Sequence, residues 1–157
     1  MEFEEIYQKY SPKIYRVCMG YPNDREQARD LTQETFIAVW QNLAGFKGNS
    51  HISTWIFRIA TNKCLRAIET AKKMPKTELP FDLATHEDEK PVEKLSYLYR
   101  CIAGLEEIDR IIISLVLEDL PQAEIAAIVG LSTVNTRVRI HRIKEKLANK
   151  FKRAWTI

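Results

Sequence analysis

The stretch that decides the fold of the C-terminal part is Gln122-Ala123-Glu124-Ile125-Ala126-Ala127-Ile128-Val129-Gly130-Leu131-Ser132. A short helix is expected to end at Gly130, because a left-handed backbone conformation costs little only for glycine and asparagine. Four residues earlier, Ala126 is small enough for a second helix to cross closely above it. Leu131 would fill the corner, and Ser132 would cap the following helix. This spacing predicts a helix-turn-helix, whose second helix enters the major groove of DNA.

Charge is distributed unevenly around this motif. The whole chain of 157 residues has a net charge of only +3. Residues 136–157, however, carry eight basic and one acidic side chain, whereas residues 76–96 and 97–135 have net charges of −3 and −4. A basic block beside an acidic stretch predicts a polyanionic partner at the C-terminal end. The alternative, a basic helix face that is only solvated, is less consistent with the preceding turn.

The basic helix itself predicts how DNA is contacted. Arg137, His141 and Arg142 are spaced so that their tips can converge on one segment of a groove. Arginine suits bidentate contacts with guanine, and Lys144 and Lys146 suit phosphates. The side chains expected to pack inward are Val134, Val138, Ile140, Ile143 and Leu147.

Helical spacing of apolar residues continues through the rest of the chain, so an all-α fold is expected. The first helix covers about residues 3–17, and Ser11-Pro12 either kinks it or restarts a second helix. Asn23-Asp24-Arg25-Glu26 is typical of a capping box that opens a helix to about Ala44.

A third helix is expected to run to about Lys73, with Ser50 or Ser53 as its cap. Its core face is predicted to consist of Ile52, Ile56, Ile59, Ala60, Cys64, Ala67 and Ile68.

Periodicity is lost between residues 74 and 91, where three prolines and a run of acids predict an extended, flexible linker. The expected organisation is therefore a helical domain over residues 1–73, a linker over 74–91 and a second helical domain over 92–157.

Several classes of protein are excluded by the sequence. Its uncharged runs are too short to cross a membrane, and its acidic N-terminus is unlike a signal peptide. Cys18, Cys64 and Cys101 form no CxxC pair. Zinc bound by Cys18, Cys64 and His51 is the alternative, but buried free thiols are the better interpretation. No cofactor and a cytoplasmic location are expected.

Four segments of the N-terminal half resemble a known family: Asp30-Leu31-Thr32-Gln33-Glu34-Thr35-Phe36, Val39-Trp40, Phe46-Lys47-Gly48 and residues 53–63. They are similar to the promoter-melting domain of bacterial sigma factors. With the C-terminal helix-turn-helix, the chain resembles the extracytoplasmic-function (ECF) class of sigma factors. The resemblance implies binding to core RNA polymerase, recognition of −35 and −10 promoter elements and DNA melting.

The third helix carries one polar and aromatic stripe, formed by Trp55, Arg58, Asn62 and Arg66. Aromatic, basic and amide groups together suit unpaired bases, although Trp55 could simply belong to the core. The resemblance implies that the adjoining loop and Asn62 capture a base flipped from the −10 element. The residues predicted to contact this element are Phe46, Lys47, Gly48, Asn49, Trp55, Arg58, Asn62, Lys63 and Arg66.

Acidic side chains on the second helix allow two interpretations. Asp30, Glu34 and Glu26 could hold a metal for phosphodiester cleavage, but ion pairs with Arg25 and Arg29 are simpler. No enzymatic activity is therefore expected. The resemblance implies that this helix docks on core polymerase, through Asp30, Leu31, Thr32, Gln33, Glu34, Phe36 and Trp40, with Phe36 shared with the core.

In the C-terminal domain, the resemblance assigns −35 contacts to Arg137, Val138, His141 and Arg142. Val138 and His141 are not the commonest residues at these positions, which implies a different preferred promoter sequence. The expected partners are core RNA polymerase, double-stranded promoter DNA and the melted non-template strand, and an anti-sigma factor is common in the family. The alternative function is a stand-alone helix-turn-helix regulator that binds duplex DNA without polymerase.

Overall fold

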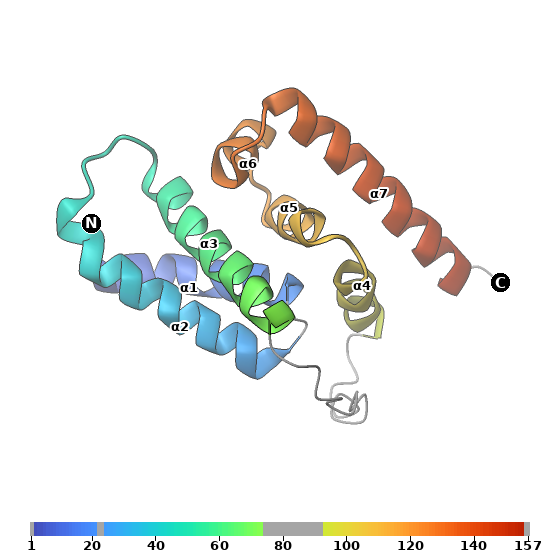
Figure 1. Ribbon diagram of the computed structural model, residues 1–157, viewed down its shortest axis with the longest axis horizontal. Coiled ribbons are helices and arrows are strands. Elements are labelled where there is room, and N and C mark those ends of the chain that lie inside the picture. The colour runs from blue at the N-terminus through green and yellow to red at the C-terminus, as the bar shows by residue number, and fades with distance from the viewer. Residues whose placement is uncertain (1, 22–23, 74–92, 156–157) are drawn as a thin grey trace.

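The computed structural model describes residues 2–21, 24–73 and 93–155 (Figure 1). No strand occurs among them, and the expected all-helical class is confirmed. The linker expected over residues 74–91 lies outside the described residues. The elements are α1 (Phe3–Gly20), α2 (Arg25–Asn42), the 3-10 turn η1 (Leu43–Gly45), α3 (Ile52–Lys73), α4 (Glu93–Ala103), α5 (Glu107–Leu117), α6 (Gln122–Val129) and α7 (Thr133–Trp155).

The first two helices begin and end much as their sequences predict. α1 is one helix with Pro12 inside it, so the predicted alternative of a second helix starting there is wrong. Asp24 caps α2: its Oδ1 accepts hydrogen bonds from the backbone N–H groups of Glu26, at 2.9 Å, and Gln27, at 3.3 Å. α2 ends at Asn42, and the chain tightens into the 3-10 turn η1 before the loop.

The start of α3 differs from the prediction. The helix begins at Ile52, so neither Ser50 nor Ser53 occupies the capping position directly before it. Ser53 instead donates a hydrogen bond to Glu124 on α6. The predicted core face is largely correct, but Ile52, Ile59 and Ala67 are only partly buried, and Phe57 is an unpredicted buried member. The core therefore extends further around α3 than a single apolar stripe suggests.

All three cysteines are free and buried. Cys64 donates a hydrogen bond to Cys18 with a distance of 3.9 Å between the sulfurs, so α1 and α3 bring the two thiols together despite their separation in sequence. The hydrogen bond with Cys18, together with burial, raises the pKa of the Cys64 thiol. These residues behave as small apolar side chains of the core.

Burial predicts slow chemistry at these thiols. In the folded protein at pH 8, Ellman's reagent is expected to react about a hundredfold more slowly than in the urea-unfolded chain, because attack requires an opening of the core. Release of thionitrobenzoate measures both rates. Rapid reaction of two thiols in the folded protein would contradict the packing of α1 on α3.

The helix-turn-helix forms as its sequence predicts. Gly130 ends α6 with a left-handed backbone (φ 77°), and its N–H donates to the carbonyl of Ala126 at 2.9 Å. Leu131 is partly buried against the core at the corner. The Ser132 hydroxyl accepts a hydrogen bond from the backbone N–H of Asn135 at 3.0 Å, which caps α7.

The rotational setting of α7 differs from the prediction at two positions. Val134 and Val138 are 60% and 40% exposed, so the expectation that they pack inward is wrong. The buried face consists instead of Thr136, Ile140, Ile143 and Leu147. Helices α4, α5 and α6 pack against α7, and the side opposite its buried face is exposed.

Helices α1–α3 and α4–α7 form two groups that pack side by side, with α5 and α6 against α1 and α3 (Figure 1). We call the contact between them the seam. Arg16 on α1 and Glu118, which follows α5, form a two-pronged ion pair with N···O distances of 2.6–2.9 Å. Gly20 allows close approach, because a Cβ there would overlap the Ser114 hydroxyl.

The seam also contains an aromatic contact. The guanidinium group of Arg110 lies 5.1 Å from the centre of the Tyr21 ring, within the range of a cation–π interaction. Burial raises the pKa of the Tyr21 phenol to about 12. Buried residues of both groups belong to one continuous hydrophobic core, so the seam is a packed interface.

Candidate nucleic-acid and polymerase interfaces

The exposed side of α7 forms the first candidate interface. We define its recognition face as Val134, Arg137, Val138, His141 and Arg142, all of which are exposed. These residues lie on one side of the helix, opposite its buried face, as their spacing requires. The structure therefore brings together four of the six side chains predicted to contact the −35 element. It adds Val134, which was predicted to pack inward.

Two lysines and one further arginine of α7 have different surroundings. Lys144 and Lys146 are exposed beyond the recognition face. Arg139 is partly buried, and its Nη1 lies 3.1 Å from Oδ1 of Asp109 on α5. This ion pair fixes α7 on α5, so Arg139 has a structural role.

The second candidate interface surrounds the loop between η1 and α3. Phe46 stacks on Trp55, with ring centres 4.8 Å apart. Beside this pair lies an open cavity of about 510 Å³, whose lining includes Lys47, Asn49 and Arg58. Gly48 turns the loop with φ 75°, a conformation that disfavours other residues. Five of the nine predicted −10 residues thus line one hollow, and Gly48 lies in the loop between two of them.

The three remaining −10 residues continue along α3. Asn62 and Arg66 are exposed, and Lys63 is partly exposed. Because Trp55 is also partly exposed, it is not simply a core residue. We call these nine residues the melting surface: Phe46, Lys47, Gly48, Asn49, Trp55, Arg58, Asn62, Lys63 and Arg66.

Helix α6 covers one end of the melting surface. Arg58 Nη2 donates a hydrogen bond to the carbonyl of Ala127 at 3.1 Å. The hydroxyls of Ser53 and Thr54 both donate to Oε1 of Glu124 at 3.0 Å. In this arrangement the recognition face is open, whereas Arg58 is engaged by a protein group.

The third candidate interface is on α2, where Asp30, Gln33, Glu34 and Trp40 are exposed. Trp40 is 65% exposed, and Ile37, one turn before it, is 56% exposed. Large apolar side chains grouped in this way on a surface are typical of a protein-binding site.

Leu31 and Thr32, which were predicted to dock on polymerase, are instead interior, and Phe36 is buried in the core that it was expected to share. Leu31, Thr32 and Phe36 are each less than 10% exposed, and the Thr32 hydroxyl donates to the carbonyl of Ala28. The helical period turns these three positions toward α1 and α3, which pack against α2. We define the docking surface as Asp30, Gln33, Glu34, Ile37 and Trp40. The three buried side chains lie on the inner side of the same helix.

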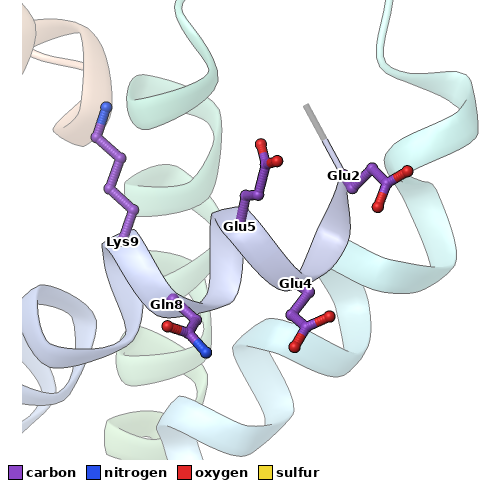
Figure 2. Close-up of a pocket in the computed structure, with 5 residues that line it drawn as sticks. All are labelled: Glu2, Glu4, Glu5, Gln8 and Lys9. Carbon is purple, nitrogen blue, oxygen red and sulfur yellow. The ribbon is translucent and has the colours of Figure 1, made fainter.

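An acidic hollow at the start of α1 does not form a site for a metal. Figure 2 shows the carboxylates of Glu2, Glu4 and Glu5 pointing in different directions instead of toward a common centre. Among the described residues, no three His, Cys, Asp or Glu side chains gather in a way that could hold a metal ion. None of the described helices combines the length and hydropathy that a membrane crossing needs.

Comparisons with known proteins identify the family of this chain. The family model described as Sigma-70 region 2 matches residues 6–74, and the model described as Sigma-70, region 4 matches residues 95–147. ECF RNA polymerase sigma factor SigW of Bacillus subtilis is 29% identical, over 92% of this chain and 86% of that protein. ECF RNA polymerase sigma factor RpoE of Cereibacter sphaeroides is 32% identical, over 88% of this chain and 81% of that protein.

A solved structure has the same fold. The sigma factor RpoE in complex with the anti-sigma factor NepR from Bartonella quintana superposes with a TM-score of 0.76, covering 96% of each chain at 17% identity. Together the fold, the family matches and the relatives define a transcription initiation factor. The chain belongs to the ECF family of RNA polymerase sigma factors. Members of this family are initiation factors and not enzymes.

Proposed function

We propose that this sigma factor divides its work between three surfaces. The docking surface on α2 binds core RNA polymerase, the recognition face on α7 reads the −35 element, and the melting surface holds the −10 element. The boundaries that fit this division are residues 1–73, a linker over 74–91, and residues 92–157. The observation that carries the proposal is the open recognition face, with Arg137, His141 and Arg142 directed away from the core.

Binding energy would drive DNA melting at the melting surface. Extruding a base costs a few kcal/mol, and stacking on an aromatic ring returns about 1–3 kcal/mol per base. Trp55 offers such a ring beside the cavity. A base would stack on it after Phe46 moves away from the ring, or would join both rings in one stack. Asn62 supplies amide donors and acceptors, and Lys63 and Arg66 attract the phosphates of the non-template strand.

Full use of the melting surface requires the seam to open. Arg58 must leave the carbonyl of Ala127 before it can contact DNA. Core polymerase would favour the open form if it binds the two helical groups apart. The partners in this proposal are core polymerase, the promoter duplex and the melted non-template strand, all in the cytoplasm. An anti-sigma factor is a further partner, supported by the complex of the Bartonella quintana neighbour.

Two alanine variants separate the roles of the surfaces, each serving as the control for the other. Arg142→Ala is expected to weaken binding of the holoenzyme to the −35 element by roughly 5- to 150-fold, since one bidentate contact contributes about 1–3 kcal/mol. Asn62→Ala should leave this binding unchanged and lower permanganate reactivity of thymines in the −10 element. Both variants should bind core polymerase as the wild type does.

Pull-down with core polymerase, duplex binding and run-off transcription measure these effects. Loss of core association in Arg142→Ala would contradict the division of labour. Sequence-specific duplex binding without any core association would instead favour a stand-alone regulator, an alternative that the Sigma-70 region 2 match over residues 6–74 argues against.

A further inference from the structure

Two exposed valines occupy the centre of the recognition face. Val134 and Val138 are 60% and 40% exposed. At 3.6 residues per turn they lie about 40° apart on α7, nearly opposite the buried Ile140 and Ile143. The two valines therefore form an apolar patch on the exposed side of α7, with His141 beside Val134 and Glu145 two turns beyond Val138.

Cationic groups stand on both sides of these valines. By the same helical period, Arg137 lies to one side of Val134 and Arg142 lies on the far side of Val138. Lys144 and Lys146 add positive charge beyond them. An apolar strip between cations fits a polyanion with apolar groups on its surface, and it fits a purely apolar protein surface poorly.

The choice of valine is informative because it does not stabilise the helix. Valine is a weaker helix former than alanine, and at these positions it packs against no core. In a helix, however, its χ1 angle is held in one rotamer about nine times in ten. Each valine thus presents two methyl groups in a fixed place.

The major groove offers one apolar group of matching size, the C5-methyl of thymine. We infer that Val134 and Val138 read thymine in the −35 element through contacts with this methyl group. The inference rests on the proposed placement of α7 in the major groove. Arg137 and Arg142 then fix the register, through guanine or phosphate contacts, and the valines select A·T pairs between them.

Replacement of thymine by deoxyuridine tests this directly, because it removes only the methyl group. The holoenzyme is first used to select preferred sequences from duplexes with a randomised −35 region. Each thymine of the selected element is then replaced singly on either strand. At one thymine or more, wild-type affinity should fall about three- to fivefold, as expected for one buried methyl group.

Val134→Ala and Val138→Ala, combined with the deoxyuridine replacements, form a double-mutant cycle. Both variants are expected to fold, because alanine favours the helix. At a thymine that a valine contacts, the deoxyuridine penalty should fall below about 1.5-fold in the corresponding variant. Leu117→Ala is the control, because Leu117 is a similarly exposed aliphatic residue on α5 and should retain the full penalty. The inference is overturned if no replacement affects the wild type, or if both valine variants retain the penalty. A holoenzyme that selects no −35 sequence at all would instead remove the proposed function.

Discussion

Replacing Trp40 with alanine is expected to weaken binding to core RNA polymerase by about thirtyfold or more. Central aromatic residues of protein interfaces commonly contribute at least about 2 kcal/mol each. Trp40 is the most exposed large apolar residue among the described part of the chain, and Ile37 lies one turn away on the same helix. Burying both would remove a substantial apolar area from water, with Gln33 and Glu34 as a polar rim.

The effect should be confined to this surface. Because Trp40 is 65% exposed, its loss leaves no cavity, and the melting temperature should change little. Biolayer interferometry with immobilised core polymerase measures the affinity. Phe36→Ala is the informative comparison, since this buried ring contacts Tyr7 edge-on at 5.0 Å and its removal should lower stability instead. Wild-type affinity in Trp40→Ala would place the docking surface elsewhere.

The sequence predicted the helix-turn-helix well because that motif is local. The left-handed turn at Gly130 and the cap at Ser132 depend on residues only a few positions apart. The same is true of the cap at Asp24. Side chains that decide such features carry their own conformational preference, so neighbouring residues suffice to recognise them.

The apolar pattern of α7 predicted burial for two residues that are exposed. Val134 and Val138 fit an apolar spacing, but Thr136 and Arg139 turn the other side of α7 inward. A pattern based on hydrophobicity alone does not predict that a threonine is buried or that an arginine forms an ion pair. The converse error placed Leu31 and Thr32 on the docking surface, although the helical period turns them toward α1 and α3.

The seam could not have been predicted from local pattern. Arg16 and Glu118 are separated by 102 residues, and each is an ordinary charged residue in its own helix or turn. Ser53 resembles a helix cap until Glu124 is seen opposite it. Only Gly20 carried a signal, since a glycine in the last turn of a helix permits close approach of another element.

Reversing the charge of Arg16 is expected to open the seam. In Arg16→Glu, two carboxylates would face each other, and Glu118, whose side chain is only 6% exposed, would lose its partner. A buried charge left without a partner is destabilising, although the 48% exposure of Arg16 lets water reduce the cost. Small-angle X-ray scattering should therefore show a larger radius of gyration for Arg16→Glu and also for Glu118→Arg.

The double exchange, Arg16→Glu with Glu118→Arg, restores opposite charges and should return the scattering profile toward that of the wild type. Opening frees Arg58 from Ala127, so the single variants should bind a single-stranded −10 oligonucleotide more tightly than the wild type without core polymerase. Arg153→Glu, an exposed reversal far along α7, controls for net charge and should remain compact. If the single reversals keep the compact profile, the ion pair does not hold the seam, and the packed contacts around Gly20 and Tyr21 must be sufficient to close it.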